Sequence, residues 1–534
     1  MERPSLKLPD LSEESLTPLV QELVEHIQHL QAYIQCLEDE IKRLKEQNKR
    51  PKLRPSTMDQ EAGKDEDESE ELGATGRGKK RKQKTAQLEI HETVPMPVDQ
   101  VPEDATFKGY EDFVVQDLHI ELHNICYRLE RWERVDGTYL IAQPPAWLGG
   151  GHYGPTVVSY ILYQHYGCYV TQPLLLEQLH ELGIEISSGQ LNRILIENKE
   201  AFHQEKDGLL TAGLEASKYV QTDDTGARHQ GKNGYCTHIG NELFTWFKST
   251  GSKSRINFLE LLRGGHTDYV INAGALAYLE EHKLRAELIE RLESHGGSFP
   301  DAKAWEKHLN ALGVLGERHR KIATEGALMG SLLAHGLPED LTILSDDAGQ
   351  FNVFEHALCW IHAERNINKI VPLNPTHAKQ LNWVREQIWT LYADLKAYKL
   401  NPSAEQKAQI EAYFDEVGRT RIEFATLQRA LHRFGENKSE LLLVLERPEL
   451  PLHNNLSESD IREYAKRRKI SGGTRSDEGR RCRDTFLSLK KTCRKRGISF
   501  WRYLTDRITG TQTIEWLPDL IRTVADQKPQ RIPP

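Results

Sequence analysis

The sequence has no long run of apolar residues and no paired cysteine motif. None of its segments approaches the ~18 consecutive apolar residues that a membrane-spanning helix requires, so we expect no contact with a membrane. The start of the chain also lacks the basic end and apolar run of a secretion signal, and we therefore expect a cytoplasmic protein. Seven cysteines are scattered singly, without a Cys-x-x-Cys pair. This pattern argues against a disulfide framework and against a four-cysteine zinc site.

The chain also has no overall excess of positive charge, but its charges are segregated. Its 534 residues have a formal net charge of −9, which by itself disfavours a nucleic-acid partner. Between Arg462 and Arg502, however, fifteen Lys or Arg stand against four Asp or Glu. Such a stretch is the electrostatic footprint of a nucleic-acid surface, although a solvated pair of basic helices is the alternative. A chain of this length should hold several domains of roughly 100–200 residues each.

The first hundred residues predict a coiled coil and then a linker. Apolar residues recur with alternating steps of four and three from Leu23 to Leu44, which is a heptad pattern. Residues 1–50 are therefore predicted to form a coiled coil that makes the protein a homo-oligomer, and the alternative is an amphipathic helix that packs on its own chain. Residues 51–108 predict a disordered charged linker, because they carry acidic and basic runs with few large apolar residues.

Residues 109–216 are expected to form a helical DNA-binding region. Two predicted helices, 172–182 and 189–198, flank a turn that contains Gly183, and a serine before the second helix could cap it. This spacing is typical of a helix-turn-helix. Helical hairpins with a glycine turn also occur in proteins that do not bind DNA.

From Lys218 the period of the apolar residues changes to that of strands. Three segments, 218–228, 234–241 and 243–249, predict an antiparallel meander, which a helix over 254–263 follows. Mostly helical residues then precede another strand that ends at Ser345. We predict a multidomain α/β protein: a mixed sheet formed by 217–264 and 339–505 with basic C-terminal helices, a helical insertion over 265–338, and a tail over 506–534.

Two aspartate pairs lie in or at the end of predicted strands, where acidic residues are unfavourable. Asp223 and Asp224 lie in the first strand, and Asp346 and Asp347 end a later one. Two carboxylates from neighbouring strands and a third from a helix can hold two Mg²⁺ ions about 3.5–4 Å apart, which activate the attacking oxygen and stabilise the leaving oxygen of a phosphodiester. The alternative is that these aspartates belong to ordinary turns.

Glu458 is the candidate third carboxylate, and its sequence context allows two interpretations. Asn455 and Glu458 fit a capping box at the start of a helix, which is a structural role. Arg462 and Lys466 follow at i+4 and i+8, and such cations suit a catalytic helix that lies along a phosphate backbone. They could also form salt bridges with Glu458. The following glycine-containing segment, 471–475, is expected to be a flexible loop that approaches phosphates.

Together these motifs resemble the insertion-sequence-66 family of bacterial DDE transposases, whose catalytic domain has a ribonuclease-H-like fold. The family's Asp-Glu-Thr triplet is similar to residues 223–225, and its second aspartate precedes an aromatic residue by five positions, as Asp346 precedes Phe351. Its Asn-Asn-Leu-x-Glu motif is similar to residues 454–458. Its Cys-Trp-x-His-x-x-Arg segment is similar to residues 359–365. Cys359 and His362 supply only two zinc ligands, so a zinc site there would need distant partners. The alternative is that this segment is a buried strand-to-helix junction.

The resemblance implies a transposase that cleaves and transfers DNA strands with Asp223, Asp346 and Glu458 as catalytic residues. These carboxylates would bind two Mg²⁺ or Mn²⁺ ions, and the partners would be double-stranded DNA and accessory proteins of the same element. The residues expected to contact DNA are Cys359, Trp360, His362, Arg365, Asn455, Arg462, Lys466, Arg467, Arg468, Lys469 and Arg475.

The sequence departs from the family before the catalytic domain and in the helical insertion after Arg263, which is longer than expected. Many members have a cysteine-rich zinc-binding segment before the catalytic domain, where this chain has only Cys126. Two other functions are compatible with the sequence. One is a non-catalytic or co-opted DNA-binding relative that self-associates through its coiled coil, and the other is a structural coiled-coil assembly factor.

Overall fold

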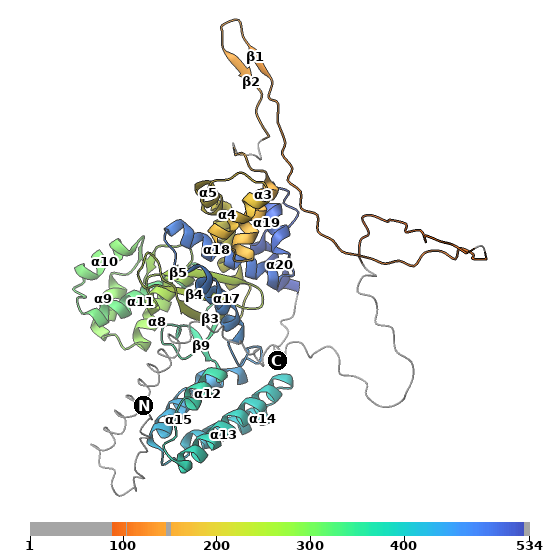
Figure 1. Cartoon of the computed structure of the whole chain (residues 1–534). Helices are drawn as coiled ribbons and strands as arrows, with labels where there is room; N and C mark the ends of the chain where they lie inside the picture. The colour runs from red at the N-terminus through yellow and green to blue at the C-terminus, as the bar shows by residue number, and fades with distance from the viewer. Residues whose placement is uncertain (1–87, 103, 146–150, 528–534) are drawn as a thin grey trace, which may run out of the picture. The chain divides into compact units, whose positions relative to one another are not determined.

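The computed structural model describes residues 88–102, 104–145 and 151–527 (Figure 1). The chain divides into two units, residues 1–117 and 118–534. The described residues of the first unit contain neither helix nor strand, and almost all of their side chains are exposed. The coiled coil predicted for residues 1–50 and most of the linker predicted for 51–108 lie outside the described residues.

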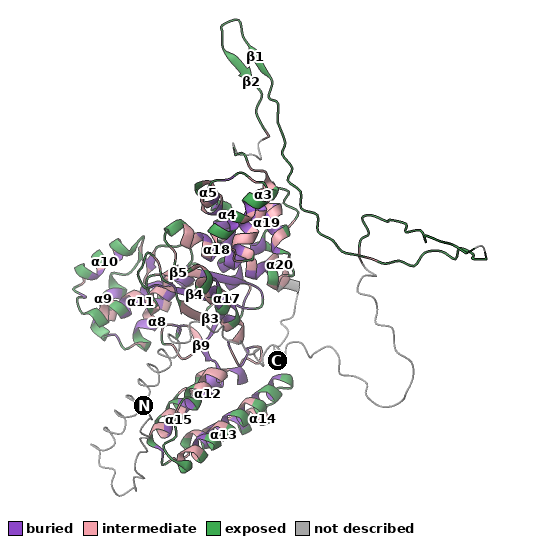
Figure 2. Cartoon of the chain, viewed as in Figure 1, coloured by how far each residue is buried: buried purple, intermediate pink, exposed green. Residues whose placement is uncertain are grey.

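The second unit begins with an exposed hairpin. Strands β1 (Arg131–Glu133) and β2 (Tyr139–Ile141) pair antiparallel, and Figure 2 shows both as exposed. The helical region predicted for 109–216 is shorter than expected, since its helices begin only at Pro155. Apolar side chains between Tyr110 and Ile141 are exposed, and a helix without a buried apolar face has little to stabilise it.

The helices that follow include the predicted helical hairpin. In chain order the elements are α3 (Pro155–Leu162), the π-helical turn η3 (Tyr163–Gly167), α4 (Gln172–Glu181), α5 (Ser188–Ile196) and α6 (Glu200–Glu215). Helices α4 and α5 form the hairpin. Gly183 lies in its turn with φ 79°, a left-handed conformation that glycine adopts without steric cost. Ser187 caps α5, because its Oγ accepts the Gln190 N–H at 3.1 Å.

A five-stranded mixed sheet confirms the predicted α/β class. The predicted meander is present as β3 (Tyr219–Gly226), β4 (Tyr235–Gly240) and β5 (Thr245–Thr250), and β8 (Thr342–Ser345) and β9 (Glu355–Leu358) extend it. The strand order is β5-β4-β3-β8-β9. The meander is antiparallel, whereas β8 pairs parallel with both β3 and β9. Strand β9 supplies the strand of the strand-to-helix junction that the sequence allowed for residues 359–365.

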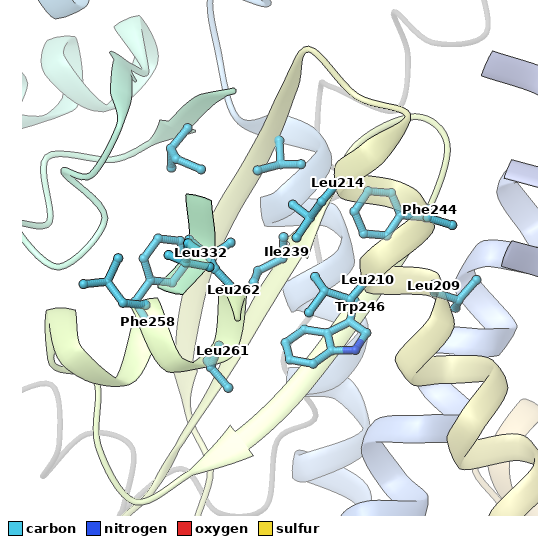
Figure 3. Close-up of a cluster of buried hydrophobic side chains, with 14 of the residues drawn as sticks. Leu209, Leu210, Leu214, Ile239, Phe244, Trp246, Phe258, Leu261, Leu262 and Leu332 are labelled. Atoms are coloured by element: carbon cyan, nitrogen blue, oxygen red, sulfur yellow. The ribbon is translucent and has the colours of Figure 1, made fainter. Parts of the chain in front are cut away.

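Each face of the sheet packs against helices, and the two faces differ in character. One face buries apolar side chains of β4 and β5 against α6, α7 (Arg255–Leu262) and α11 (Glu317–Ala334), as Figure 3 shows for Ile239, Trp246 and Leu332. The other face lies under α17 (Asn455–Ser471) and α18 (Asp477–Lys495), where Phe247, Tyr464 and neighbours form a smaller cluster. The aspartate-bearing strand β3 contacts α17 on this second face.

Two helical blocks interrupt the sheet domain, whereas the sequence predicted one insertion. The predicted one is β6 (Tyr269–Val270), α8 (Ala273–Glu281), α9 (Ala286–Ser294), β7 (Ser298–Phe299), α10 (Ala302–Ala311) and α11. The second comprises α12 (Trp360–Asn368), α13 (Pro375–Leu400), α14 (Ala404–Arg419), α15 (Ala425–Glu436), α16 (Lys438–Leu441) and the 3-10 turn η4 (Leu443–Leu445). This second block has an apolar core of its own. Residues 339–505 are therefore not one continuous part of the sheet domain.

The predicted tail is partly helical. Helix α19 (Phe500–Thr509) packs on α3, and α20 (Leu517–Gln527) packs on α6. The Leu517 N–H donates to Glu205 Oε1 at 3.1 Å, and Ile521 is fully buried. These contacts fix the segment, so the described part of the predicted tail, 506–527, is packed on the domain. Within the described ranges, no helix is long and apolar enough to cross a membrane.

Candidate active site

The parallel pairing of β3 with β8 brings two of the predicted carboxylates together. Gln221 lies opposite Leu344 in this pair, so the same register carried two residues further sets Asp223 beside Asp346, which directly follows β8. Side chains at matching positions of neighbouring strands point to the same face. Both aspartates are partly buried. The sheet thus places Asp223 and Asp346 next to each other, as predicted.

Helix α17 brings Glu458 to the same face. His238 lies opposite Asp223 in the β3–β4 pair, and its ring nitrogens bond to Ser457 Oγ at 2.8 Å and Asp460 Oδ2 at 3.0 Å. The Ser457 N–H also donates to Gln221 Oε1 at 3.3 Å. Glu458 directly follows Ser457, so these three bonds hold the start of α17 over the strand that carries Asp223.

The electrostatics of Asp223 reflect this convergence. Burial raises the pKa of Asp223 to about 7, and the negative charges of Asp346, Asp224 and Glu458 add to the shift. The Asp224 N–H donates to Asp223 Oδ1 at 2.7 Å and opposes it. A carboxyl group whose pKa is raised by burial and by neighbouring negative charges lies in a site that a proton or a cation would stabilise.

Asp224 has a partner that the sequence analysis missed. Burial raises the pKa of the Asp224 carboxyl, while Lys253 and a hydrogen bond from Gln350 oppose the shift. Gln350 Nε2 donates to Asp224 Oδ2 at 2.9 Å, so Asp224 is tied to the loop that follows Asp346. Asp223 accepts no side-chain hydrogen bond within the described part of the chain. The structure therefore leaves Asp223 the freer of the two aspartates.

The carboxylate of Glu458 contacts cations. Arg365 Nη1 lies 3.0 Å from Glu458 Oε1, and Arg462 Nη2 lies 3.3 Å from Oε2. His362 Nε2 is 3.6 Å from Oε1. The capping-box alternative is not realised, because α17 begins without a side-chain cap and both Glu458 oxygens face guanidinium groups. The predicted salt bridge from Arg462 is present.

The donor set fits a hard divalent cation. Asp223, Asp346 and Glu458 offer only carboxylate oxygens, the ligands that Mg²⁺ prefers. Beside them, Asn454 is fully buried, yet neither atom of its side-chain amide has a hydrogen-bond partner among the described residues. Among the described residues, it is His266, Asp268 and His335 whose potential metal-ligand atoms all lie within 4.8 Å of one another. The three site carboxylates are close, but they are not gathered as tightly.

The Cys-Trp-x-His-x-x-Arg segment spans the junction from β9 to α12. Cys359 and Trp360 are each 1% exposed, and Trp360 Nε1 donates to the Leu441 carbonyl at 2.8 Å. Trp360 anchors α12 in the apolar core of the second helical block, and Cys359 Sγ accepts the Asn454 N–H at 3.4 Å. The DNA contact predicted for these two residues therefore does not match their burial. His362 and Arg365 lie further along α12 and reach Glu458.

The basic residues of α17 divide into buried and exposed groups. Arg467 is 4% exposed and bonds to His165 Nε2 at 2.6 Å, and Arg468 donates to the Gly226 carbonyl at the end of β3. Both guanidinium groups bond to partners inside the domain. A count of charges in the sequence cannot reveal this. Lys466 and Lys469 are exposed.

The remaining predicted DNA contacts lie at the two ends of α17. Arg475, beyond its C-terminal end, is exposed. Asn455 opens the helix and is partly buried, and its Oδ1 has no partner within the described ranges. Arg475 thus joins Lys466 and Lys469 as cations on the surface, whereas Asn455 sits beside the buried Asn454.

The glycine-containing segment after α17 is a docked loop, and the expectation of a flexible loop is corrected. The Thr474 N–H donates to the Arg228 carbonyl at 3.0 Å, and the Gln230 N–H donates to the Thr474 carbonyl at 2.8 Å. A Cβ on Gly473 would lie 2.7 Å from the Arg228 carbonyl oxygen, so glycine permits this close approach. The partner is the β3–β4 turn, which is distant in sequence.

Three further residues position the site without having stood out in the sequence. Gln350, His238 and Gln221 contact Asp224, α17 and Ser457, respectively. Only the strand register could have identified His238, because it lies opposite Asp223. Gln350 lies between Asp346 and Phe351. The motif is defined by those two residues and their spacing, so it did not single out Gln350.

Comparison with known proteins agrees with this geometry. Residues 342–481 match the family model described as "Transposase IS66 family". The chain is also 43% identical over 303 residues to the uncharacterized protein y4jO of Sinorhizobium fredii, an alignment that covers 56% of this chain and 94% of that protein. The chain belongs to the IS66 transposase family. The matched segment of this IS66 family member begins at β8 and includes Asp346 and Glu458. No solved structure matches it.

Proposed function

We propose that this IS66 family protein is a DDE transposase, in which Asp223, Asp346 and Glu458 hold two Mg²⁺ or Mn²⁺ ions and act on double-stranded DNA. The observation that carries the proposal is the meeting of three carboxylates, from β3, the end of β8 and α17, on one face of a mixed sheet, where burial and the neighbouring negative charges raise the pKa of Asp223. The strand arrangement supports a ribonuclease-H-like catalytic domain, with a meander followed by two parallel strands.

The reaction would consist of two phosphoryl transfers. Water attacks a phosphodiester at an end of the element, the bond to the 3′ oxygen breaks, and that oxygen takes up a proton as a free 3′-hydroxyl. The hydroxyl then attacks a phosphodiester of the target, forms a new phosphorus–oxygen bond and releases a target 3′-hydroxyl. When bound, the metal pair activates the attacking oxygen and stabilises the leaving oxygen.

The other residues of the site bind and position the DNA. Lys466 and Lys469 extend from the helix that carries Glu458, and Arg475 follows it, so these three cations would neutralise phosphates next to the carboxylates. The α4–α5 hairpin is proposed to read the ends of the element, and residues 1–50 to join protomers. Accessory proteins of the same element would act with this assembly.

The proposal is tested by strand transfer with the variants Asp346→Asn and Glu458→Gln. Both substitutions keep the shape of the side chain and remove its charge, and a catalytic metal contributes several kcal/mol. We expect activity to fall roughly a hundredfold or more. The matched control is Asp347→Asn, because Asp347 is adjacent to Asp346 but pairs with Arg433 at 2.6 Å. Wild-type activity in Asp346→Asn or Glu458→Gln would refute the catalytic assignment.

A non-catalytic DNA-binding relative predicts a different result. It would bind duplex DNA through the same cations but would produce no Mg²⁺-dependent nicks in DNA that carries the element ends. A titration of Mg²⁺ in a nicking assay with the wild-type protein separates the two functions.

A further inference from the structure

Arg365 occupies the position of a counter-ion to Glu458. It extends from α12, and its Nη1 lies 3.0 Å from Glu458 Oε1, while Arg462 faces the other oxygen at 3.3 Å. The Glu458 side chain is only 12% exposed, whereas 36% of the Arg365 side chain remains accessible. Arg365 therefore reaches from the surface to a largely buried carboxylate.

This ion pair conflicts with metal binding at the same carboxylate. A Mg²⁺ ligand oxygen lies about 2.0–2.1 Å from the ion, so a guanidinium that stays on that oxygen would lie within a few ångströms of a divalent cation. At such distances like charges repel strongly, especially in a partly buried site. The arginine and the metal ion therefore compete for Glu458 Oε1.

The neighbouring contacts indicate that the side chain of Arg365 can move while its helix stays in place. Trp360 anchors the start of α12 in an apolar core. Glu364, the residue before Arg365, is buried and paired with Arg385 at 2.6 Å. Arg365 has no second acceptor among the described residues, since its one hydrogen bond there is to Glu458. Loss of that bond leaves a free guanidinium beside the site.

We propose that Arg365 exchanges partners, holding Glu458 in the metal-free protein and binding a DNA backbone phosphate once Glu458 takes a metal ion. This inference rests on the proposed function, because it requires Glu458 as a metal ligand and DNA as substrate. A guanidinium binds phosphate and carboxylate with the same bidentate geometry. The exchange links the two binding events, so metal raises the affinity for DNA and DNA raises the affinity for metal by the same factor.

Arg365, more than Arg462, carries this exchange. Arg462 is four residues from Glu458 on the same helix and is 56% exposed, and exposed pairs of this kind are weak and tolerate rearrangement. Arg365 comes from another helix and makes the shorter contact. Release of Arg365 from Glu458 would leave its guanidinium beside both the metal site and the exposed surface of α12.

The experiment measures Mn²⁺ binding by calorimetry without DNA, and binding of a labelled duplex of arbitrary sequence with and without Mn²⁺. In Arg365→Ala we expect Mn²⁺ alone to bind roughly threefold to tenfold more tightly than in the wild type, since its competitor is gone. We also expect the factor by which Mn²⁺ raises DNA affinity, roughly 5-fold or more in the wild type, to fall toward one. Loss of a merely structural residue would weaken Mn²⁺ binding instead.

Matched variants make the outcome specific to this contact. Arg419→Ala removes an exposed arginine from the same helical block, where it pairs with Asp415, and should leave both measurements unchanged. Glu458→Gln should bind DNA more tightly without metal, because Arg365 is released. In the double variant Glu458→Gln/Arg365→Ala that gain should disappear.

The failures of the two proposals are distinguishable. Absence of Mn²⁺ and Mg²⁺ binding to the wild-type protein would contradict the proposed function itself. Mn²⁺ binding that is equal or weaker in Arg365→Ala, with an unchanged effect on DNA affinity, would overturn the exchange while leaving the metal site intact.

Discussion

Substitution of Asp223 by asparagine should stabilise the metal-free protein at alkaline pH. The pKa of Asp223 is raised from 3.8 to about 7 in the fold. A raised pKa means that the folded state holds the proton more tightly, so this stabilisation is fully present below about pH 4 and is lost as the pH rises through about 7. Above that pH the wild type keeps an unfavourable negative charge that Asp223→Asn lacks.

The size of the effect follows from the two pKa values. Between about pH 5.5 and about pH 8, proton linkage to a group with these pKa values changes the free energy of unfolding by about 2 kcal/mol. For a domain of this size class, about 2–4 °C of melting temperature corresponds to each kcal/mol. The melting temperature of Asp223→Asn minus that of the wild type should therefore rise by roughly 4–8 °C between these two pH values.

The assay is thermal unfolding of both proteins in chelator, repeated with Mg²⁺. The difference between variants is used because partly buried histidines such as His165, whose pKa burial and Arg467 lower to about 3, give the wild type a pH dependence of the opposite sign. Mg²⁺ at about a hundred times its dissociation constant should stabilise the wild type by about 2.7 kcal/mol, and Asp223→Asn much less.

Two results would refute this reasoning. One is a melting-temperature difference between wild type and Asp223→Asn that does not change with pH, since Asp223 would then not titrate in the fold. The other is an equal Mg²⁺-induced shift in both proteins, since Asp223 would then not be a ligand. Asp347→Asn, which removes a neighbouring carboxylate paired with Arg433, should match the wild type in both measurements.

Two further predictions concern the elements that hold the site. Burial opposes ionisation of Asp460, but Lys495, His238 and Lys491 outweigh it and hold its pKa well below its usual range. Asp460→Ala removes the carboxylate that pairs with the largely buried ammonium of Lys495 at 2.8 Å, which should cost about 3–5 kcal/mol and lower the melting temperature by roughly 6–20 °C. An unchanged melting temperature would contradict the role of this network. Gly473→Ala places a Cβ 2.7 Å from the Arg228 carbonyl oxygen, so limited proteolysis should cut the 471–475 loop faster than in the wild type. Equal rates would show that the docked loop does not depend on this contact.

Local sequence patterns determined much of the sheet domain. The meander, the capped helix after it and the α4–α5 hairpin follow from apolar period, turn glycines and serine caps, which act over a few residues. The order of the motifs around Asp223, Asp346 and Glu458 was sufficient to identify the family, which the comparisons confirm. Charge composition correctly marked α17 and α18 as basic.

Tertiary structure alone decided what many of these residues do. Amphipathic period shows that a helix buries one face but not against which core, so the second helical block was not separated from the sheet domain in sequence. Arg467 and Arg468 have the same charge as Lys466 and Lys469, yet two point inward to partners at residues 165 and 226 and two stay exposed. The choice depends on packing between elements far apart in the chain.

The same distinction between sequence and tertiary structure applies to the three carboxylates. Their residue types and motif contexts are properties of the sequence, and so is the chemistry that they can perform. Their convergence depends on the parallel register of β3 with β8 and on the bonds from Gln221 and His238 to Ser457. The pairing of Glu458 with Arg365 likewise joins residues 93 positions apart. Such contacts arise only when the helices and strands pack, because nothing local in either segment specifies its partner.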